Sequence, residues 1–357
     1  MHLLQLPFPS LTSLAVYFTN RDRFRDALRS LPELSPSIRN LTLRTDRLDI
    51  AFSRVASSCI CRWRNLQTLA CDQITLDMDA LTHLSRMPTL TQLEFTSDPT
   101  LPTFDSPLFF PNLHSLTLWS GSLTSISQLL SQTRLPAIME FTADTENCPS
   151  KRELSFFWAS LQTSTVGHTI ESFTLHQHFP SGDPFRPKVD LEDLRPCMAF
   201  SSLCHIMFDI EWNVDFTDSQ LLALASACPS LADLCINEYS GWNTSGGITP
   251  NGLQQLLLKC LCLLSVSLAL DTRGYTQLPA NGLLASVGYT SPFFWLNVVD
   301  SIIEADSVPA VAAFLAGMPS LLVVLGTWLG GFLKPPGWEI YKERWDDVRG
   351  RIGSPVG

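Results

Sequence analysis

The sequence lacks an uninterrupted apolar run of about 18 residues, the length at which a membrane-spanning helix is expected. Its longest apolar stretch, LLVVLGTWLGGFL (321–333), is too short to cross a bilayer. The first ten residues, MHLLQLPFPS, contain no Lys or Arg before their apolar part and carry prolines within it. This composition excludes a secretory signal peptide, so we expect a protein of the cytoplasm or nucleus.

Charged residues are scarce, at 16% of the chain, whereas apolar residues make up 45%. This balance is typical of a folded chain with a large core and excludes extensive disorder. The 34 acidic and 24 basic residues give a net charge of −10. A charge of this sign argues against non-specific binding to nucleic acid or to an anionic membrane.

Catalytic and metal-binding motifs are also missing. We find no GxSxG, HExxH, Walker A loop or strand-associated GxGxxG. The close cysteine pairs Cys59/Cys61 and Cys260/Cys262 do not have CxxC spacing. Cys71, Cys235 and Cys260 lie within apolar runs, so we predict that they are buried as small apolar side chains. We therefore expect no enzymatic activity, no cofactor and no metal.

One pattern is abundant: apolar-x-x-apolar-x-apolar, as in FPNLHSLTLWS (110–120). Its first apolar residue falls at Leu11, Ile38, Leu66, Leu90, Leu113, Ile138, Ile170, Leu203, Leu231, Leu263, Phe293 and Leu321. Its second falls at Leu14, Leu41, Leu69, Leu93, Leu116, Phe141, Phe173, Ile206, Leu234, Val266, Leu296 and Val324. Successive units are 23 to 33 residues apart, and their mean spacing of about 28 is in the range of leucine-rich repeats.

Segments with helical periodicity lie between these predicted strands. They include residues 77–87, 217–228, 249–260 and 308–318, and two of them open with a threonine that can cap a helix, Thr217 and Thr249. Each unit is therefore one strand and one helix. We predict an α/β fold, a leucine-rich-repeat solenoid of about 12 irregular repeats with a curved parallel sheet and helices on its convex side. The solenoid is expected to span residues 1–335, followed by an amphipathic tail over 336–357.

In such strands the residues between the pattern positions face the solvent on the concave side. The predicted partner-binding residues there are Arg44, Asp72, Glu94, Trp119, Glu140, Asp144, His176, His205, Asp209, Asp233 and Trp295. Six are acidic, which favours a groove for a basic protein ligand, although acids are also the majority in the whole chain. Trp119 and Trp295 are either binding anchors or packed beneath loops. In the last strand, Val323, Leu325 and Thr327 are expected to make this face apolar.

Two other stretches differ from their surroundings. Residues 21–64 hold ten arginines and five acids, which forms either a docking patch or the solvated side of the first helices. Residues 176–190, HQHFPSGDPFRPKVD, lengthen one repeat into a loop with His176 and His178. Inserted loops of solenoids often contact ligands, whereas two histidines without a third ligand are a weak metal signal.

Three segments carry a resemblance to a known family: residues 217–236, 249–268 and 296–328, followed by YKERWDDVRGRI (341–352). Together they resemble the leucine-rich-repeat portion of fungal (basidiomycete) F-box proteins. The resemblance implies a substrate receptor of a cullin-type ubiquitin ligase. In that family an N-terminal F-box binds the ligase adaptor, and the repeats select the protein that is ubiquitinated.

The sequence departs from this family at its N-terminus, because the first repeat begins at Leu11 and leaves no room for an F-box. Leu3, Leu4, Leu6 and Phe8 lead into a first strand without a polar cap, which we interpret as the loss of a front segment from a longer parent. We therefore expect a non-catalytic protein-binding solenoid, with adaptor and cullin as partners only where an F-box is supplied. A free-standing scaffold or decoy is the alternative. A repeat-type GTPase activator or nuclease inhibitor fits less well, because the repeat lengths vary.

Overall fold

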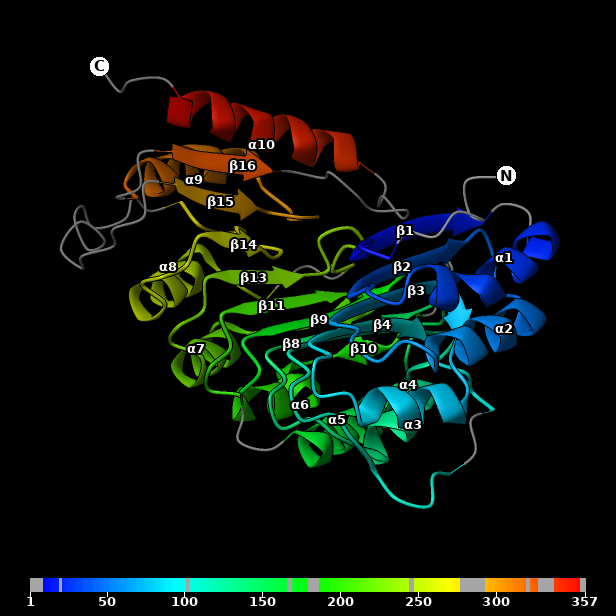
Figure 1. The fold of residues 1–357 in the computed structure, drawn as a ribbon. Helices are drawn as coiled ribbons and strands as arrows, with labels where there is room; N and C mark the ends of the chain where they lie inside the picture. The colour runs from blue at the N-terminus through cyan, green and yellow to red at the C-terminus, as the bar shows by residue number, and fades with distance from the viewer. Residues whose placement is uncertain are drawn as a thin grey trace. The chain divides into compact units, whose positions relative to one another are not determined.

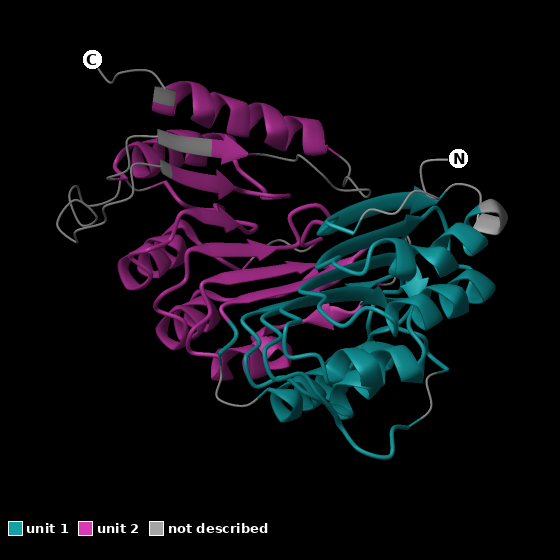
Figure 2. Ribbon diagram, in the orientation of Figure 1, with its two compact units in different colours: residues 1–170 teal, residues 171–357 magenta. Residues whose placement is uncertain are grey.

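The computed structural model describes residues 9–18, 21–100, 103–165, 169–178, 186–243, 247–276, 293–318, 322–326 and 337–353. The chain divides into two compact units, residues 1–170 and 171–357 (Figure 2). Among the described residues, no helix is long and apolar enough to cross a membrane. Several predicted features lie outside the described residues: Leu3, Leu4, Leu6 and Phe8, residues 179–185 of the loop over 176–190, and the boundary at residue 335.

Unit 1 alternates strands and helices along the chain (Figure 1). Its parallel strands are β1 (Ser13–Phe18), β2 (Asn40–Thr45), β3 (Thr68–Thr75), β4 (Gln92–Thr96), β6 (Ser115–Ser120) and β8 (Glu140–Thr145). Its helices are α1 (Arg21–Leu34), α2 (Ile50–Ile60), α3 (Met78–Ser85), α4 (Leu123–Ser131) and α5 (Lys151–Ser164). The helices cover one face of the strands, which leaves the other face uncovered (Figure 1).

The register of unit 1 follows the sequence repeat. The six predicted second apolar positions lie in one row across the sheet, through the pairs Leu14↔Leu41, Leu41↔Leu69, Leu69↔Leu93, Leu93↔Leu116 and Leu116↔Phe141. From Leu41 onward these side chains are fully buried or nearly so. Burial of one apolar residue per strand in a continuous row fixes the register, because a slip of one residue would expose the whole row.

One repeat of unit 1 has no helix in its described part. Between β4 and β6 the chain instead forms β5 (Leu108–Phe109), which pairs in parallel with β7 (Thr133–Arg134). This connection contains Pro99, Pro102 and Pro107, and proline is disfavoured inside a helix.

Unit 2 is built in the same way. Its parallel strands are β9 (Ser172–Gln177), β11 (His205–Asp209), β13 (Asp233–Ile236), β14 (Ser265–Ser267), β15 (Phe293–Asn297) and β16 (Leu322–Gly326). A separate pair is formed by β10 (Lys188–Val189) and β12 (Asn213–Val214). The helices are α6 (Leu191–Leu194), α7 (Asp218–Ala227), α8 (Pro250–Lys259), α9 (Val308–Ala316) and α10 (Trp338–Gly353), with 3₁₀ helices over Arg195–Ala199 and Ala305–Ser307.

The predicted apolar positions of unit 2 also lie in register, from Phe173↔Ile206 through Ile206↔Leu234 and Leu234↔Val266 to Val266↔Leu296. The last strand is an exception, because Leu296 pairs with Leu325 and not with Val324. Leu325 is buried, so its predicted position on the solvent-facing side was wrong. Throughout both units, parallel strands alternate with helices, which confirms the α/β leucine-rich-repeat fold class.

The helix starts are set by capping residues. Thr217 accepts a hydrogen bond from the backbone of Gln220 at the start of α7, and Thr249 does the same from Gly252 at α8, as predicted. The predicted segments 77–87 and 308–318 contain α3 and α9. Each cap satisfies a backbone N–H group that has no partner within the helix.

Buried tryptophans form hydrogen bonds to backbone carbonyl groups within each unit. The indole N–H of Trp63 donates to the carbonyl of Ser35 at 3.0 Å, and that of Trp242 donates to Ile236 at 2.7 Å. Trp345 of α10 donates to Ser301 at 3.1 Å and is fully buried. A large apolar ring whose polar N–H is bonded adds buried area without an unsatisfied donor. Cys71, Cys235 and Cys260 are buried free thiols, as predicted.

Candidate partner-binding faces

We call the sheet surface that the helices leave uncovered the open face of each unit (Figure 1). In β2, Leu41 and Leu43 are buried toward the helices, whereas the alternate residue Arg44 is exposed. The open face is therefore made by the residues between the apolar pattern positions. These are the positions at which the sequence predicts partner-binding side chains.

On the open face of unit 1, charged residues and one tryptophan gather toward the ends of β2, β3, β4 and β6. Arg44 is in register with Asp72 on the next strand. The indole Nε1 of Trp119 donates to Oε1 of Glu94 at 3.3 Å. This hydrogen bond fixes the half-buried ring on the sheet, because the indole has no other polar atom.

The carboxyl group of Glu94 lies at the centre of these charges. Burial raises its pKa above the ordinary value, and the negative charges of Asp72 and Asp144 add to the increase. The hydrogen bond from Trp119 and the charge of Arg44 act in the opposite direction. The net shift of the pKa is upward because burial outweighs these two opposing contributions.

The structure brings five of the six predicted residues of unit 1 together and separates the sixth. Asp144 is in register with Trp119, whereas Glu140 lies at the opposite end of β8 and pairs with Ser115. Four residues of extended chain separate the two acids, about 13 Å. Asp144 is only 6% exposed, so our expectation that it faces solvent was wrong.

On the open face of unit 2, register places His205, Asp233, Ser265 and Trp295 in one row across four strands. Nδ1 of His205 lies 2.6 Å from Oδ2 of Asp233. Trp295 is 41% exposed. The row therefore offers a hydrogen-bonded polar pair at one end and an accessible aromatic ring at the other.

His176 and Asp209 form a second neighbouring pair, in register near the ends of β9 and β11. Asp209 is 2% exposed, which contradicts the predicted solvent exposure. Its Oδ1 accepts a hydrogen bond from the backbone N–H of Ser240 at 3.1 Å, so the connection after β13 covers it. Burial raises the pKa of Asp209, and the hydrogen bonds from Ser240 and the charge of His176 only partly oppose the increase.

The sequence reasoning did not identify Glu238 and Tyr239, which follow β13. Glu238 accepts hydrogen bonds from the Cys235 thiol at 3.3 Å and from the Asn297 amide at 3.0 Å, so it reaches back over the strands. Tyr239 is an exposed aromatic residue beside it. Their position depends on the left-handed backbone of Asn237, with φ of 53°, which the strand pattern does not reveal.

No protein-family model matches the chain, and no curated protein matches its sequence. Among solved structures, the chain is similar to one in the crystal structure of the Rad7 and Elc1 complex of yeast. The sequence identity is 13% and the TM-score is 0.43, and the match covers 92% of this chain and 73% of the other. A similarity of this strength supports no functional inference for this chain.

Proposed function

We propose that this chain is a non-catalytic protein-binding solenoid that binds its partner on the open faces. The observation that carries the proposal is the arrangement around Glu94, where a tryptophan is held on the sheet by a hydrogen bond to a half-buried carboxylate. A rigid aromatic ring beside a half-buried charged group is typical of a binding hot spot.

The partner of unit 1 is a basic protein segment in this proposal. A lysine or arginine side chain placed beside Glu94 adds a positive charge that stabilises this carboxylate, whose pKa is raised mainly by burial. The face of Trp119 can contact the aliphatic part or the cationic head of the same side chain. Asp144 is buried, so it acts through its charge and not by direct contact.

Unit 2 contributes its own contacts to the proposal. His205, Asp233 and Trp295 bind together because they share one row, and Trp295 provides the apolar anchor. His176 supports the neighbouring end of the face. Asp209 keeps the connection after β13 in place through Ser240 and is not expected to contact a partner.

The more specific form of the proposal is that the chain resembles the substrate-recognition part of an F-box-type ubiquitin ligase receptor. The repeat architecture and the three resembling segments support it. Ligase adaptor and cullin are then partners only where an F-box is supplied by another segment or chain. The alternative is a scaffold or decoy that binds the same protein without recruiting a ligase.

The test is a quantitative comparison of partners purified with the tagged wild-type chain and with two open-face variants, Glu94→Gln and Trp119→Ala. Two matched controls make the same chemical changes elsewhere in unit 1: Glu146→Gln in an exposed connection and Phe156→Ala on the exposed side of α5. A protein that binds the open face should no longer co-purify with Glu94→Gln or Trp119→Ala but should still co-purify with the two control variants.

The purified partner is then titrated against each variant. We expect Trp119→Ala to weaken binding about thirtyfold, as a hot-spot truncation does, and Glu94→Gln to weaken it about tenfold. Equal binding by all four variants would refute the open-face proposal. The presence or absence of adaptor and cullin in the same purification separates the ligase receptor from the scaffold.

A further inference from the structure

Unit 1 has an uneven charge distribution between the two ends of its strands. The segments that lead into the strands, residues 35–39, 61–67, 86–91, 110–114 and 132–139, contain five arginines and no Asp or Glu. The described segments that follow the strands contain six acids and only one base, Arg47. One edge of unit 1 is therefore basic, although the protein as a whole carries a net charge of −10.

Backbone hydrogen bonds show which of these residues are equivalent. Four hydrogen bonds link successive repeats: the N–H of Gln67 donates to the carbonyl of Arg39, that of Thr91 to Gln67, that of His114 to Thr91, and that of Met139 to His114. These four donors occupy the same place in successive repeats. The residues five positions before them are therefore also equivalent, and they are Arg62, Arg86, Phe109 and Arg134. We call these four residues the arginine stripe.

The order of the arginine stripe is supported by a direct pairing, because Phe109 and Arg134 are in register in the small β5–β7 sheet. Phe109 is 55% exposed, so the stripe places an accessible ring between guanidinium groups. Arg62 is held by Glu33 at 2.5 Å and by the carbonyl of Arg29 at 2.8 Å. Among the described residues, Arg86 forms no salt bridge.

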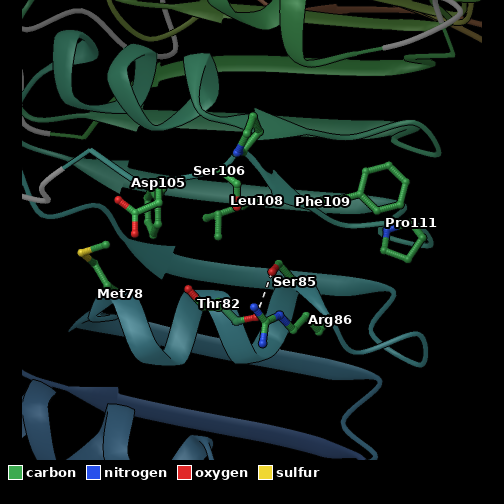
Figure 3. A pocket seen from close by; sticks show the side chains of 11 residues that line it. Met78, Thr82, Ser85, Arg86, Asp105, Ser106, Leu108, Phe109 and Pro111 are labelled. Carbon is green, nitrogen blue, oxygen red and sulfur yellow. Dashed lines mark hydrogen bonds between the residues drawn. The ribbon is translucent and has the colours of Figure 1, made fainter.

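A cavity of about 490 Å³ opens beside the centre of the stripe. It lies between α3 and the segment around β5, where this repeat has no helix. Figure 3 shows Arg86 and Thr82 on the helix side and Phe109 and Pro111 on the opposite side. Asp105 is the only acid in the lining, so the cavity combines an apolar wall with a guanidinium group.

Helix electrostatics explain part of this pattern. Arg62 and Arg86 lie at the C-terminal ends of α2 and α3, where a positive charge is favourable. Arg134 belongs to a strand, and Arg39 directly precedes β2, so the same explanation does not extend to them. It also gives no reason for an exposed phenylalanine within the row.

We propose that the arginine stripe binds an acidic, extended segment of a partner protein. Carboxylates of the segment pair with Arg62, Arg86 and Arg134, and one apolar side chain enters the cavity beside Phe109. This site lies on a different surface from the open face and does not depend on it. A long polyanion such as RNA is disfavoured, because the net charge of −10 repels it.

The experiment measures fluorescence anisotropy of a labelled acidic octapeptide, Glu-Asp-Glu-Leu-Phe-Glu-Asp-Glu, on the full chain at low salt and at about 0.15 M salt. Two control peptides replace every acid with its amide or replace Leu-Phe with Ser-Ser. We expect saturable binding of the acidic peptide, weakened by salt, and at least tenfold weaker binding of both controls.

Variants locate the binding site. Arg86→Glu and Phe109→Ala are each expected to weaken binding about tenfold or more, whereas Arg152→Glu, the same charge change on the exposed side of α5, leaves it unchanged. Unchanged circular dichroism and melting temperature exclude unfolding as the cause. The open-face variants Glu94→Gln and Trp119→Ala also retain binding, so this test does not depend on the proposed function.

Three results would overturn the proposal. The first is the absence of saturable binding of the acidic peptide by the wild-type chain. The second is an equal loss with Arg86→Glu and Arg152→Glu, which indicates non-specific attraction. The third is tighter binding of oligo-uridine RNA or of anionic phosphatidylserine vesicles than of the peptide, which makes the stripe a site for phosphates.

Discussion

Arg186 and Glu211 form an ion pair in the interior of unit 2. Nη2 of Arg186 lies 3.4 Å from Oε1 of Glu211, and the two side chains are 3% and 1% exposed. Arg186 also donates to the carbonyl of Ser240 at 2.8 Å, and the backbone N–H of Glu211 donates to the side chain of Gln177 at 3.0 Å. The pair thus connects the end of the inserted loop to the end of β9 and to the segments after β11 and β13.

Removal of one charge from this pair leaves the other buried without compensation. We expect Glu211→Gln to lower the free energy of unfolding by about 3–5 kcal/mol. The double substitution of Arg186→Met with Glu211→Leu should lower it by less than the sum of the losses from Arg186→Met alone and Glu211→Leu alone. Urea unfolding monitored by circular dichroism measures both.

The neighbouring pair of Lys188 and Asp215 is the control, because it is exposed although its ion-pair distance is 2.5 Å. Removal of its charge by Asp215→Asn is expected to change the free energy of unfolding much less than Glu211→Gln does, because water screens an exposed pair. Equal losses at the two pairs would mean that burial does not determine the strength of the Arg186–Glu211 pair.

Asn237 supports the turn after β13 through three hydrogen bonds. Its Oδ1 accepts from the backbone N–H of Ile210 at 3.1 Å, and its Nδ2 donates to the carbonyls of Trp212 and Gly241, each at 3.2 Å. Asn237→Ala leaves these buried groups unsatisfied, and we expect a loss of about 2–4 kcal/mol in urea unfolding.

Two further substitutions separate backbone conformation from hydrogen bonding at this position. Asn237→Gly removes the same bonds but tolerates the positive φ, so it should cost less than Asn237→Ala. Asn237→Asp places an acceptor against two carbonyl oxygens and should cost at least as much as Asn237→Ala. A well-tolerated Asp would show that the two donated bonds contribute little.

The repeat and its register were predictable because apolar and polar residues alternate in most strands. Leu41, Leu93 and Leu116 each stand between polar neighbours, so only one register buries them. In the last strand the run LLVVL is apolar at every position, and the prediction chose Val324 where the structure pairs Leu325. Without alternation, the sequence contains no signal that distinguishes the two registers.

The candidate sites were less predictable, because they depend on contacts between repeats. Strand alternation correctly assigned Asp209 to the open face, but its burial results from Ser240, 31 residues later in the chain. The hydrogen bond between Glu94 and Trp119 joins adjacent repeats in the same way. The cavity beside Phe109 lies where the described part of one repeat forms no helix, and the repeat spacing does not indicate this, because the repeat before it is almost equally short and contains α3.

Gly252 of α8 is required by the position of Asp218 on the preceding helix. A Cβ atom on Gly252 would lie 2.1 Å from Oδ1 of Asp218, and that carboxylate is held by the backbone N–H and hydroxyl of Thr249 at 2.8 and 2.7 Å. We therefore expect Gly252→Ala to destabilise the protein by about 1–3 kcal/mol, through overpacking.

The sign of this effect should reverse when the carboxylate is absent. In an Asp218→Ala background the new methyl group has space, and Gly252→Ala should then stabilise the helix by up to about 1 kcal/mol, the ordinary difference between the two residues. A thermodynamic cycle of the four proteins measures the coupling. If Gly252→Ala has the same effect in both backgrounds, Asp218 is not the reason for the glycine.

Asp209 should make the stability of unit 2 dependent on pH. Burial raises its folded-state pKa above the ordinary value of 3.8, so the folded protein keeps this proton at a pH where the unfolded chain has lost it. The unfolded state then binds fewer protons, and stability falls as the pH rises from 3.8 through the raised pKa. Above that window the cost of the buried charge is complete and stays constant.

Asp209→Asn keeps an oxygen acceptor for the N–H of Ser240 but cannot ionise. The difference in melting temperature between variant and wild type should therefore increase in favour of the variant from acidic to neutral pH. Asp105→Asn, the same change at an exposed carboxyl group, controls for the loss of one negative charge. A constant difference across the pH range would mean that the nearby His176 and the hydrogen bonds from Ser240 fully compensate the buried charge.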